Sequence, residues 1–309
     1  MKIAFLGTPD FALPSLKMLH DRGDEVVVFT QPDKPVGRKA IMTAPPVKKA
    51  ALEYGMKVYQ FDKIRGEEGA AALKTEKPDL MVTAAFGQIL SRENLDVPKY
   101  GCINVHGSLL PKYRGAAPIQ WAVINGEEVT GVTTMLTDVG LDTGDILLKK
   151  ETEIGENETA GELFDRLAEL GADTLNETIE LLLAGKLSPV KQNEAEATKC
   201  GMIKKEYGHI DFSKGSDAVH NLVRGMNPWP CAYAMLNGEA VKIWATRHSD
   251  AQESRGEPGL IIRADRFNGI LVDCGDGVIE ITELQFPGAK RMDAISAVLG
   301  HKIAYEVFK

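Results

Sequence analysis

The sequence predicts an α/β protein in which a mostly parallel sheet, covered by helices on both faces, is followed by a smaller all-β domain. Short apolar runs alternate with helical patterns through the first half of the chain, which is typical of β-α-β units. After Pro189 the pattern changes to short strand-like runs separated by glycine-containing turns. The length of 309 residues also exceeds the roughly 250–300 residues that one core usually serves, so two domains are expected.

The strands of the parallel sheet are expected where short apolar runs occur, because strands covered on both faces are apolar throughout. In chain order the expected strands are Lys2–Leu6, Glu25–Thr30, residues 58–59, Leu80–Ala84, Cys102–His106, Val132–Met135 and Ile146–Lys149. The helices expected between them are Pro14–Asp21, Pro46–Tyr54, Glu67–Lys74 and Ala117–Asn125.

A longer helical pattern covers Ala160–Ala184. Its apolar residues follow a spacing of about 3.6 residues, as on one face of a helix. We expect one amphipathic helix, or two abutting helices that meet at Gly171, to close the first domain.

The chain is expected to divide into a first domain at residues 1–189, a linker at residues 190–205 and a second domain at residues 206–309. Residues 190–205 are polar and have few apolar anchors, which indicates a linker. The strand-like runs of the second domain are Val241–Ala245, Gly259–Arg263, Ile270–Cys274 and Val278–Leu284. Their spacing favours a small β-barrel or sandwich.

Composition excludes several classes of protein. A hydrophobic fraction of 44% and a charged fraction of 26% are ordinary for a globular enzyme, and no apolar stretch approaches the roughly 20 residues of a membrane span. The four cysteines are far apart, which argues against disulfides and zinc and is consistent with a reducing cytoplasm. The net charge of −8 argues against nucleic-acid binding over the whole surface, although a local basic face can still bind phosphates.

The first strand-to-helix turn argues against nucleotide cofactors. The layout is Rossmann-like, but the turn at Gly7–Ala12 lacks the G-x-G-x-x-G pattern that accommodates a dinucleotide pyrophosphate, and no phosphate-binding P-loop pattern occurs. Thr8 or Asp10 is expected to cap the following helix instead.

The densest candidate site lies in residues 102–111. On a strand, Asn104 and His106 point to the same face, and the strand ends at His106, where open α/β sheets bind their ligands. An asparagine amide can donate to a developing oxyanion, and a histidine can move a proton near neutral pH. The alternative is a strand-end histidine that only bonds a neighbouring carbonyl, but the pair together favours a catalytic role.

A second polar loop, Thr137–Asp145, carries three acids and two glycines. Taken alone it is a turn with solvated carboxylates, and no glutamate stands where a calcium loop needs one. Taken with His106, one of its aspartates could orient the imidazole and stabilise its protonated form.

Residues 31–40 form a long basic segment rich in proline and glycine, which is expected to be a functional or merely solvated loop. Lys34, Arg38 and Lys39 could contact phosphates there.

Several of these segments resemble the methionyl-tRNA formyltransferase family. The run Gly101–Gln120 is similar to the formyl-tetrahydrofolate motif of folate-dependent formyltransferases, and Asp138–Asp145 resembles their second motif. Residues 1–12, 31–48, 162–171 and 227–230 also resemble the tRNA enzymes, so the likeness spans both domains.

The resemblance implies a catalytic set of Asn104, His106 and Asp142. It further implies folate contacts by two groups of residues, namely Ser108, Leu109, Leu110 and Pro111, and Phe86, Gly87, Ile89 and Leu90. Residues 206–309 should form an OB-like barrel that, with the loop around Arg38, binds the acceptor stem of initiator methionyl-tRNA. Basic candidates in or near that domain are Lys199, Arg247, Lys290 and Arg291.

The expected activity is transfer of a formyl group from 10-formyltetrahydrofolate, as co-substrate, to initiator methionyl-tRNA. The resemblance implies a cytoplasmic monomer with no metal and no membrane contact. Two alternatives stay open: a sugar-nucleotide amine formyltransferase with the same folate donor, and a non-enzymatic RNA-binding protein that uses the α/β domain as a scaffold.

Overall fold

The computed structural model describes residues 1–37, 39–249, 251, 254–267 and 269–309, and it divides into two compact units. The first unit comprises residues 1–115, 130–152 and 164–199. The second comprises residues 116–129, 153–163 and 200–309. Both units are therefore assembled from segments that are discontinuous in the sequence.

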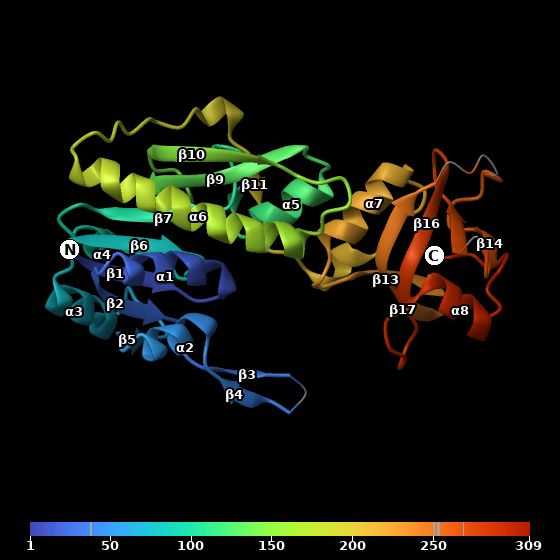
Figure 1. Ribbon diagram of the computed structural model, residues 1–309, viewed down its shortest axis with the longest axis horizontal. Coiled ribbons are helices and arrows are strands. Elements are labelled where there is room, and N and C mark those ends of the chain that lie inside the picture. The colour runs from blue at the N-terminus through green and yellow to red at the C-terminus, as the bar shows by residue number, and fades with distance from the viewer. Residues whose placement is uncertain (38, 250, 252–253, 268) are drawn as a thin grey trace. The chain divides into compact units, whose positions relative to one another are not determined.

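The first unit is built on a seven-stranded sheet (Figure 1). Its strands are β1 (Lys2–Gly7), β2 (Glu25–Thr30), β5 (Lys57–Gln60), β6 (Leu80–Ala84), β7 (Cys102–His106), β9 (Val129–Leu136) and β10 (Ile146–Glu153). The order across the sheet is β10-β9-β7-β6-β1-β2-β5, and the strands from β7 to β5 are parallel to their neighbours. β9 pairs antiparallel with β7. The expected mostly parallel sheet is confirmed.

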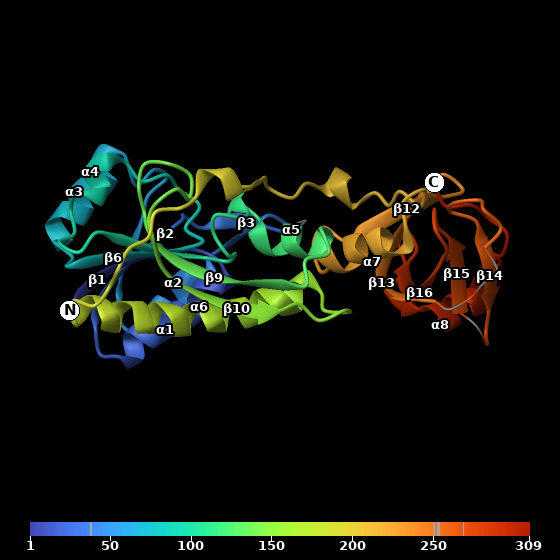
Figure 2. The ribbon, with the colours of Figure 1, turned by 90° about the horizontal axis from the view of Figure 1, so that it is seen from above.

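Helices cover both faces of this sheet. They are α1 (Leu13–Asp21), α2 (Pro46–Glu53), α3 (Glu67–Glu76), α4 (Arg92–Leu95) and α6 (Ala160–Leu183), and a short 3₁₀ turn at Asp10–Ala12 precedes α1. Figure 2 shows α1 and α6 on one face and α3 and α4 on the other. The central strands β1 and β6 are buried almost throughout, as expected for strands covered on both sides.

The long helix α6 runs without interruption past Gly171. A Cβ atom at this position would lie 2.9 Å from a side-chain methyl of Val105 on β7. The glycine therefore allows close packing of the helix on the sheet and does not break the helix, which decides between the two alternatives that the sequence leaves open.

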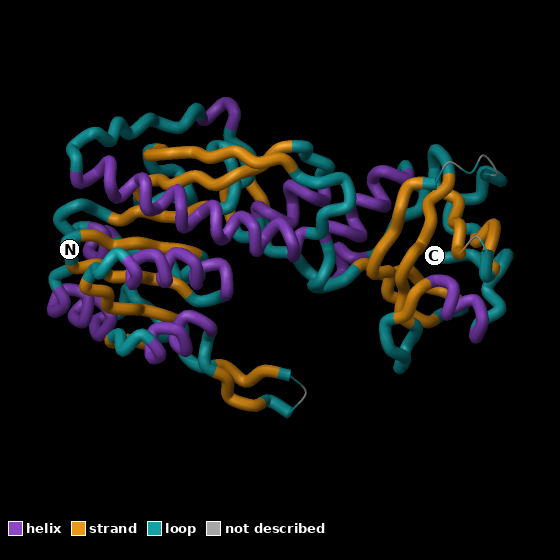
Figure 3. Tube along the Cα trace, viewed as in Figure 1, coloured by secondary structure: helices purple, strands orange, loops and turns teal. Residues whose placement is uncertain are grey.

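The basic segment after β2 is a two-stranded ribbon, whereas the sequence indicated a loop. β3 (Lys34–Val36) pairs antiparallel with β4 (Ile41–Thr43), and the ribbon extends away from the rest of the first unit (Figure 3). Proline and glycine obscured the strands in the sequence. Val36, Ile41 and Met42 are all more than half exposed, so the ribbon buries little apolar surface of its own.

Residues 190–199 belong to the first unit and are held there by backbone pairing. Val190 forms a bridge with Ile146, and a 3₁₀ turn follows at Glu194–Glu196. The two-residue strand β11 (Lys199–Cys200) then pairs with β8 (Arg114–Gly115), which lies just beyond the loop that follows β7. Backbone pairing thus fixes a segment whose polar sequence carries little sign of structure.

The second unit contains a six-stranded antiparallel sheet. Its strands are β12 (Ala232–Leu236), β13 (Glu239–His248), β14 (Ile261–Asp265), β15 (Gly269–Asp273), β16 (Val278–Gln285) and β17 (Met292–Asp293). The order is β12-β13-β16-β15-β14, with β17 on β16. The unit also holds α5 (Pro118–Ile124), a 3₁₀ turn at Lys205–Gly208, α7 (Ser216–Gly225) and α8 (Ala294–Gly300).

Residues 305–309 join the two edges of this sheet. On one side, Met235 of β12 and Lys309 exchange two backbone hydrogen bonds of 2.7 and 2.8 Å. On the other, Ile261 of β14 donates to Glu306 at 2.8 Å and accepts from Tyr305 at 2.8 Å. Because both edges bond the same segment, the sheet closes, which agrees with the expected small β-barrel.

Helix α5 belongs to the core of the second unit although its sequence lies within the first half of the chain. Trp121 and Ile124 pack against that core, and the Trp121 indole donates to the carbonyl of Gly201 at 2.9 Å. In the described part of the chain, no helix is both long enough and apolar enough to span a membrane.

Candidate functional site

The carboxyl ends of the parallel strands form one edge of the first sheet, and the polar side chains predicted from the sequence lie there. Thr8 follows β1, Gln31 follows β2, and both donate to the carbonyl of Phe86 beyond β6, each at 3.1 Å. These hydrogen bonds connect the carboxyl ends of β1, β2 and β6 to one another. Open α/β sheets bind ligands at this edge.

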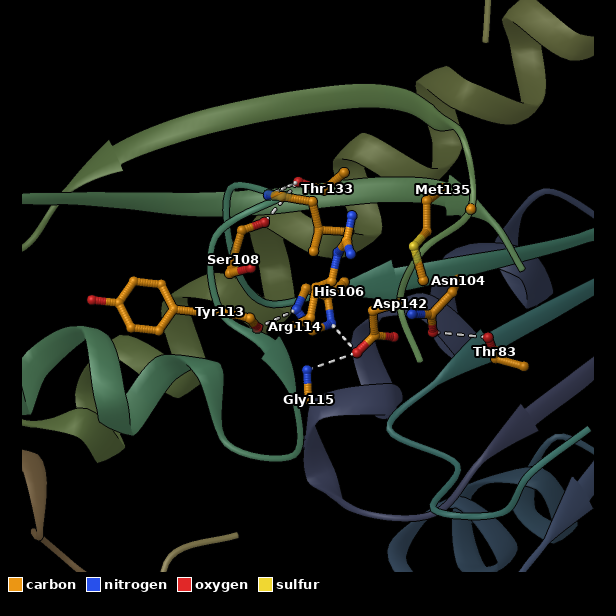
Figure 4. A network of polar contacts seen from close by, with 12 residues as sticks. Thr83, Asn104, His106, Ser108, Tyr113, Arg114, Gly115, Thr133, Met135 and Asp142 are labelled. Carbon is orange, nitrogen blue, oxygen red and sulfur yellow. Dashed lines mark hydrogen bonds and ion pairs between the residues drawn. The ribbon is translucent and has the colours of Figure 1, made fainter. Parts of the chain in front are cut away.

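Asn104 is held in a defined orientation by the neighbouring strand. Thr83 of β6 lies opposite Asn104 of β7 in the parallel register, so the two side chains share a face. The Thr83 hydroxyl donates to Asn104 Oδ1 at 2.8 Å. With its oxygen engaged, the amide directs its NH₂ group toward Asp142, as Figure 4 shows. The amide nitrogen is therefore available to donate to a negatively charged oxygen.

His106 is buried, with 6% of its side chain exposed, and both ring nitrogens face acceptors. Nε2 lies 3.0 Å from the carbonyl oxygen of Tyr113, and Nδ1 lies 3.8 Å from Asp142 Oδ2. A neutral imidazole can donate to only one of these oxygens, whereas the imidazolium can face both with a proton. The ring is therefore held between a backbone carbonyl and a carboxylate, and both nitrogens are oriented toward oxygen atoms.

Asp142 completes the group from the loop between β9 and β10. The backbone N–H of Gly115 donates to its Oδ2 at 2.8 Å, and this same oxygen faces His106 (Figure 4). The residue has a φ of +53°, in the left-handed region that favours glycine. The structure thus brings Asn104, His106 and Asp142 together, as the sequence motifs indicated.

The loop after β7, which contains Ser108, Leu109, Leu110 and Pro111, is fixed by Thr133 of β9. The Thr133 hydroxyl donates to the carbonyl of Ser108 at 2.7 Å and accepts from the N–H of Leu110 at 3.1 Å.

Ser108 is fully buried, and its hydroxyl donates to the carbonyl of Lys112 at 2.7 Å. Burial raises the pKa of the nearby Cys102 thiol to about 11. Neither side chain is thus activated as a nucleophile.

The second expected folate group follows β6. Phe86 and Leu90 are buried in the core of the first unit, whereas Ile89 is 68% exposed. Gly87 has a φ of +74°, and a Cβ atom there would lie 2.5 Å from Gln31 Nε2. The positive φ is the reason that the turn favours glycine, because the end of the Gln31 side chain could move aside. Ile89 is the member of this group whose side chain can contact a ligand without repacking.

The basic residues of the ribbon differ in their surroundings. Arg38 lies outside the described residues. Lys34 is exposed and donates to Gln31 Oε1 at 2.6 Å, and Lys39 is exposed. At the base of the ribbon, Lys48 forms an ion pair with Asp33 at 2.8 Å, and Gln60 donates to the same carboxylate. The hydrogen bond from Gln60, followed by that from Lys48, lowers the pKa of Asp33.

The four basic candidates near the second domain divide into two pairs. Arg247 pairs with Glu280 at 2.7 Å, and Arg291 pairs with Glu283. Lys199 and Lys290 are exposed. A phosphate that binds either arginine therefore competes with a carboxylate already in place.

The arrangement offers an amide donor, an imidazole and a carboxylate within one strand-end site. These are suited to stabilising an oxyanion and moving a proton during acyl or formyl transfer. Within the described ranges, no group of three or more His, Cys, Asp or Glu side chains could hold a metal ion.

Three contributors were missed in the sequence. Thr83 occurs in an apolar strand, where a threonine needs no special explanation, and only its register opposite Asn104 points to it. Tyr113 and Gly115 act through backbone atoms, which leave no sign in side-chain patterns.

Comparison with known proteins places the chain in a family. Residues 1–179 match the formyl transferase family, and residues 202–302 match the formyl transferase C-terminal domain. The chain is 53% identical over 305 residues to the methionyl-tRNA formyltransferase of Ruminiclostridium cellulolyticum, covering 98% of this chain and 97% of that protein. The chain belongs to the methionyl-tRNA formyltransferase family. The family enzyme of Acetivibrio thermocellus is 49% identical over 304 residues, with coverage of 98% and 97%.

Solved structures share the fold at lower identity. A sugar 3N-formyl transferase, WlaRD, aligns with a TM-score of 0.69 and 24% identity over 94% of this chain and 99% of that chain. HypX from Aquifex aeolicus in complex with tetrahydrofolic acid aligns with a TM-score of 0.63 and 18% identity over 100% of this chain and 51% of that chain. These likenesses support the two-part formyltransferase fold, while the identities near 50% distinguish the methionyl-tRNA family from the sugar enzymes.

Proposed function

We propose that this chain transfers the formyl group of 10-formyltetrahydrofolate to the α-amine of initiator methionyl-tRNA. The observation that carries the proposal is near-full-length identity of about 50% to methionyl-tRNA formyltransferases. The strand-end group of Asn104, His106 and Asp142 supports it, because formyl transfer needs an oxyanion donor and a proton carrier.

In this reaction the neutral amine attacks the formyl carbon, and the carbonyl electrons move onto oxygen. Asn104 Nδ2 donates to that oxygen, because the hydrogen bond from Thr83 to Asn104 Oδ1 turns the amide oxygen away from the reaction. His106, protonated and facing Asp142, stabilises the same charge. When the carbon–nitrogen bond to the folate breaks, His106 donates its proton to the leaving nitrogen, and the proton that the attacking amine loses then restores the protonated ring.

The binding surfaces are assigned as proposals. Residues 108–111 and the group Phe86, Gly87, Ile89 and Leu90 hold the folate at the carboxyl edge of the sheet. The ribbon, through Lys34, Arg38 and Lys39, and the domain at residues 206–309 hold the tRNA, with residues 190–205 between it and the catalytic domain at 1–189. We propose that the enzyme is a cytoplasmic monomer that needs no metal.

The test is formyl transfer from radiolabelled 10-formyltetrahydrofolate. Charged initiator tRNA should be formylated, and charged elongator methionyl-tRNA, as the matched control, should be formylated poorly. A panel of amino sugar nucleotides tests the alternative substrate. Turnover of a sugar amine without tRNA formylation would contradict the proposal, and tRNA binding without any folate-dependent turnover would indicate a scaffold.

A further inference from the structure

Gln192 lies in the docked segment after α6 and contacts the loop that carries Asp142. Its Nε2 donates to the backbone carbonyls of Asp142 and Gly144, each at 2.8 Å. Gln192 is about fifty residues away in the sequence from the loop that it contacts. Neither spacing nor composition therefore reveals the contact.

The other end of the Gln192 amide is held equally firmly. Its Oε1 accepts from Arg114 Nε at 3.0 Å and from Arg114 Nη2 at 2.8 Å. An amide group has two donor hydrogens and two acceptor positions, and here all four are used. This pattern fixes which end of the amide faces the Asp142 loop.

Arg114 is an unusual partner because it is 2% exposed. Its guanidinium also forms a two-pronged pair with Glu194 at 2.8 and 3.0 Å, which lowers the pKa of the Glu194 carboxyl. Glu194 itself is 72% exposed. Arg114 therefore joins an exposed carboxylate on one side to Gln192 and the site on the other.

These contacts form a closed network of hydrogen bonds that includes both the side chain and the backbone of Asp142. Arg114 precedes Gly115, whose N–H donates to the Asp142 carboxylate, and Arg114 also holds Gln192, which bonds the Asp142 carbonyl. The carboxylate and the backbone of Asp142 are thus tied to the same two-residue strand. Because Asp142 adopts a left-handed backbone conformation, this double attachment opposes its relaxation away from His106.

We propose that Gln192 is a positioning residue that holds Asp142 in place beside His106 for the formyl-transfer reaction. The inference rests on the proposed function, but the structural part of it can be tested without turnover. It assigns to residues 190–205 a role inside the catalytic site in addition to that of a linker.

The decisive variant is Gln192→Glu. Its carboxylate can still accept from Arg114, so the segment stays docked, but it faces the carbonyls of Asp142 and Gly144 with an oxygen in place of donors. We expect kcat to fall by about 10-fold to 100-fold, because small displacements of reacting groups have effects of this size. KM for folate should stay within about twofold, since Gln192 contacts none of the residues assigned to folate.

Three further variants separate this role from general destabilisation. Glu194→Gln is the matched control: it alters the exposed partner of Arg114 but not the bonds to the Asp142 loop, so kcat should stay within about twofold. Gln192→Met removes both ends of the amide without adding charge and should lower kcat as Gln192→Glu does. In an Asp142→Asn background, Gln192→Glu should cost less than about twofold more, because residues that act through one another are not additive.

The backbone amide of Gly115 reports on the position of Asp142 independently of activity. In ¹H–¹⁵N spectra of the full chain, its proton should move upfield and exchange faster in Gln192→Glu, toward the values of Asp142→Asn, and should be unchanged in Glu194→Gln. An unchanged Gly115 signal in Gln192→Glu, or fully additive losses of kcat in the double variant, would overturn the proposal. If the wild type shows no formyl transfer, the proposed function fails while the Gly115 signal still decides the role of Gln192.

Discussion

The role proposed for Asn104 as an oxyanion donor depends on the hydrogen bond by which Thr83 holds the side-chain oxygen of Asn104. A free asparagine amide can present either its oxygen or its nitrogen, and an oxygen facing the reaction would repel the developing charge. The hydrogen bond at 2.8 Å settles the orientation before substrate arrives. Preorganisation of this kind is what makes a single amide donor effective.

We expect Thr83→Val to lower kcat by about 10-fold with the fold retained, because it removes one orienting hydrogen bond without changing the side-chain shape. Steady-state formylation kinetics measure the change. Thr30→Val is the matched control: Thr30 is also buried at a strand end, and its hydroxyl has no hydrogen-bond partner among the described residues. Equal losses in the two variants would show that the hydroxyl of Thr83 has no special role.

Substitution of the three central residues should test the site itself. Asn104→Ala, His106→Ala and Asp142→Ala should each lower the rate by about 10²–10³ while folate still binds, because each removes a group that we propose to act on the transition state. Single-turnover formylation, with folate affinity measured separately by fluorescence, distinguishes the two effects. A variant with near-wild-type turnover would remove its residue from the catalytic set.

At the scale of elements, the sequence predicted the strands well and the short pairings poorly. Buried apolar runs such as Leu80–Ala84 have no stable alternative to a covered strand, so pattern alone locates them. The β3–β4 ribbon and the β8–β11 pair are held by backbone bonds and a few polar anchors, which composition does not reveal. Asn104 and His106 were found because they end a predicted strand, whereas Gln192 and Arg114 meet across 78 positions of sequence.

The ribbon gives the clearest prediction for tRNA binding. Arg38→Ala should raise KM for charged tRNA and make the negative slope of log affinity against log salt shallower by about one for each phosphate that the side chain no longer binds, with folate affinity unchanged. Lys99→Ala is the control, since it removes one exposed charge at the opposite edge of the sheet. Binding of tRNA measured over a salt series decides the matter, and an unchanged slope for Arg38→Ala would exclude it from phosphate binding.

Glu76 connects three elements of the first unit and should make stability depend on acid pH. It is 8% exposed and bonds Lys57, Tyr59 and Lys2, which lower its pKa from the ordinary 4.5 to about 2. A lowered pKa stabilises the fold fully above about pH 4.5 and progressively less as the pH falls toward about 2. Glu76→Gln should therefore lower Tm at pH 7 and differ less from the wild type at pH 3.

Thermal unfolding at the two pH values measures this effect. Glu25→Gln serves as the control, because Glu25 also pairs with Lys2 but is 69% exposed and should contribute little. An equal Tm difference at both pH values would mean that the Glu76 charge does not contribute.

At the scale of the whole molecule, the two units are interleaved in the sequence. Sequence patterning divides the chain once, after residue 189, because composition changes there. Three-dimensional packing instead assigns residues 116–129 and 153–163 to the second unit. A linear pattern cannot show this, since α5 has the same helical signal whichever core it packs against.

Trp121→Ala tests this assignment. Loss of the ring that packs on the second core should destabilise that unit by less than the roughly 3–5 kcal/mol of a fully buried ring, because Trp121 is partly buried. Hydrogen exchange should then show faster exchange in β12–β16 and unchanged protection in β1, β2, β6 and β7. Trp229→Ala is the control, because that ring is 54% exposed and its removal should change exchange little. Protection that falls mainly in the first unit would contradict the division.

Exchange of the barrel between related enzymes cannot therefore be made with a single crossover. A chimera joined near residue 200 keeps α5 and residues 153–163 from one parent and places them in the core of a barrel from the other. The α5 and α7 helices pack closely against one another, so their apolar surfaces must have matched during divergence. Swaps that carry all three segments together should fold, and recombination within the family is expected to respect the same boundaries.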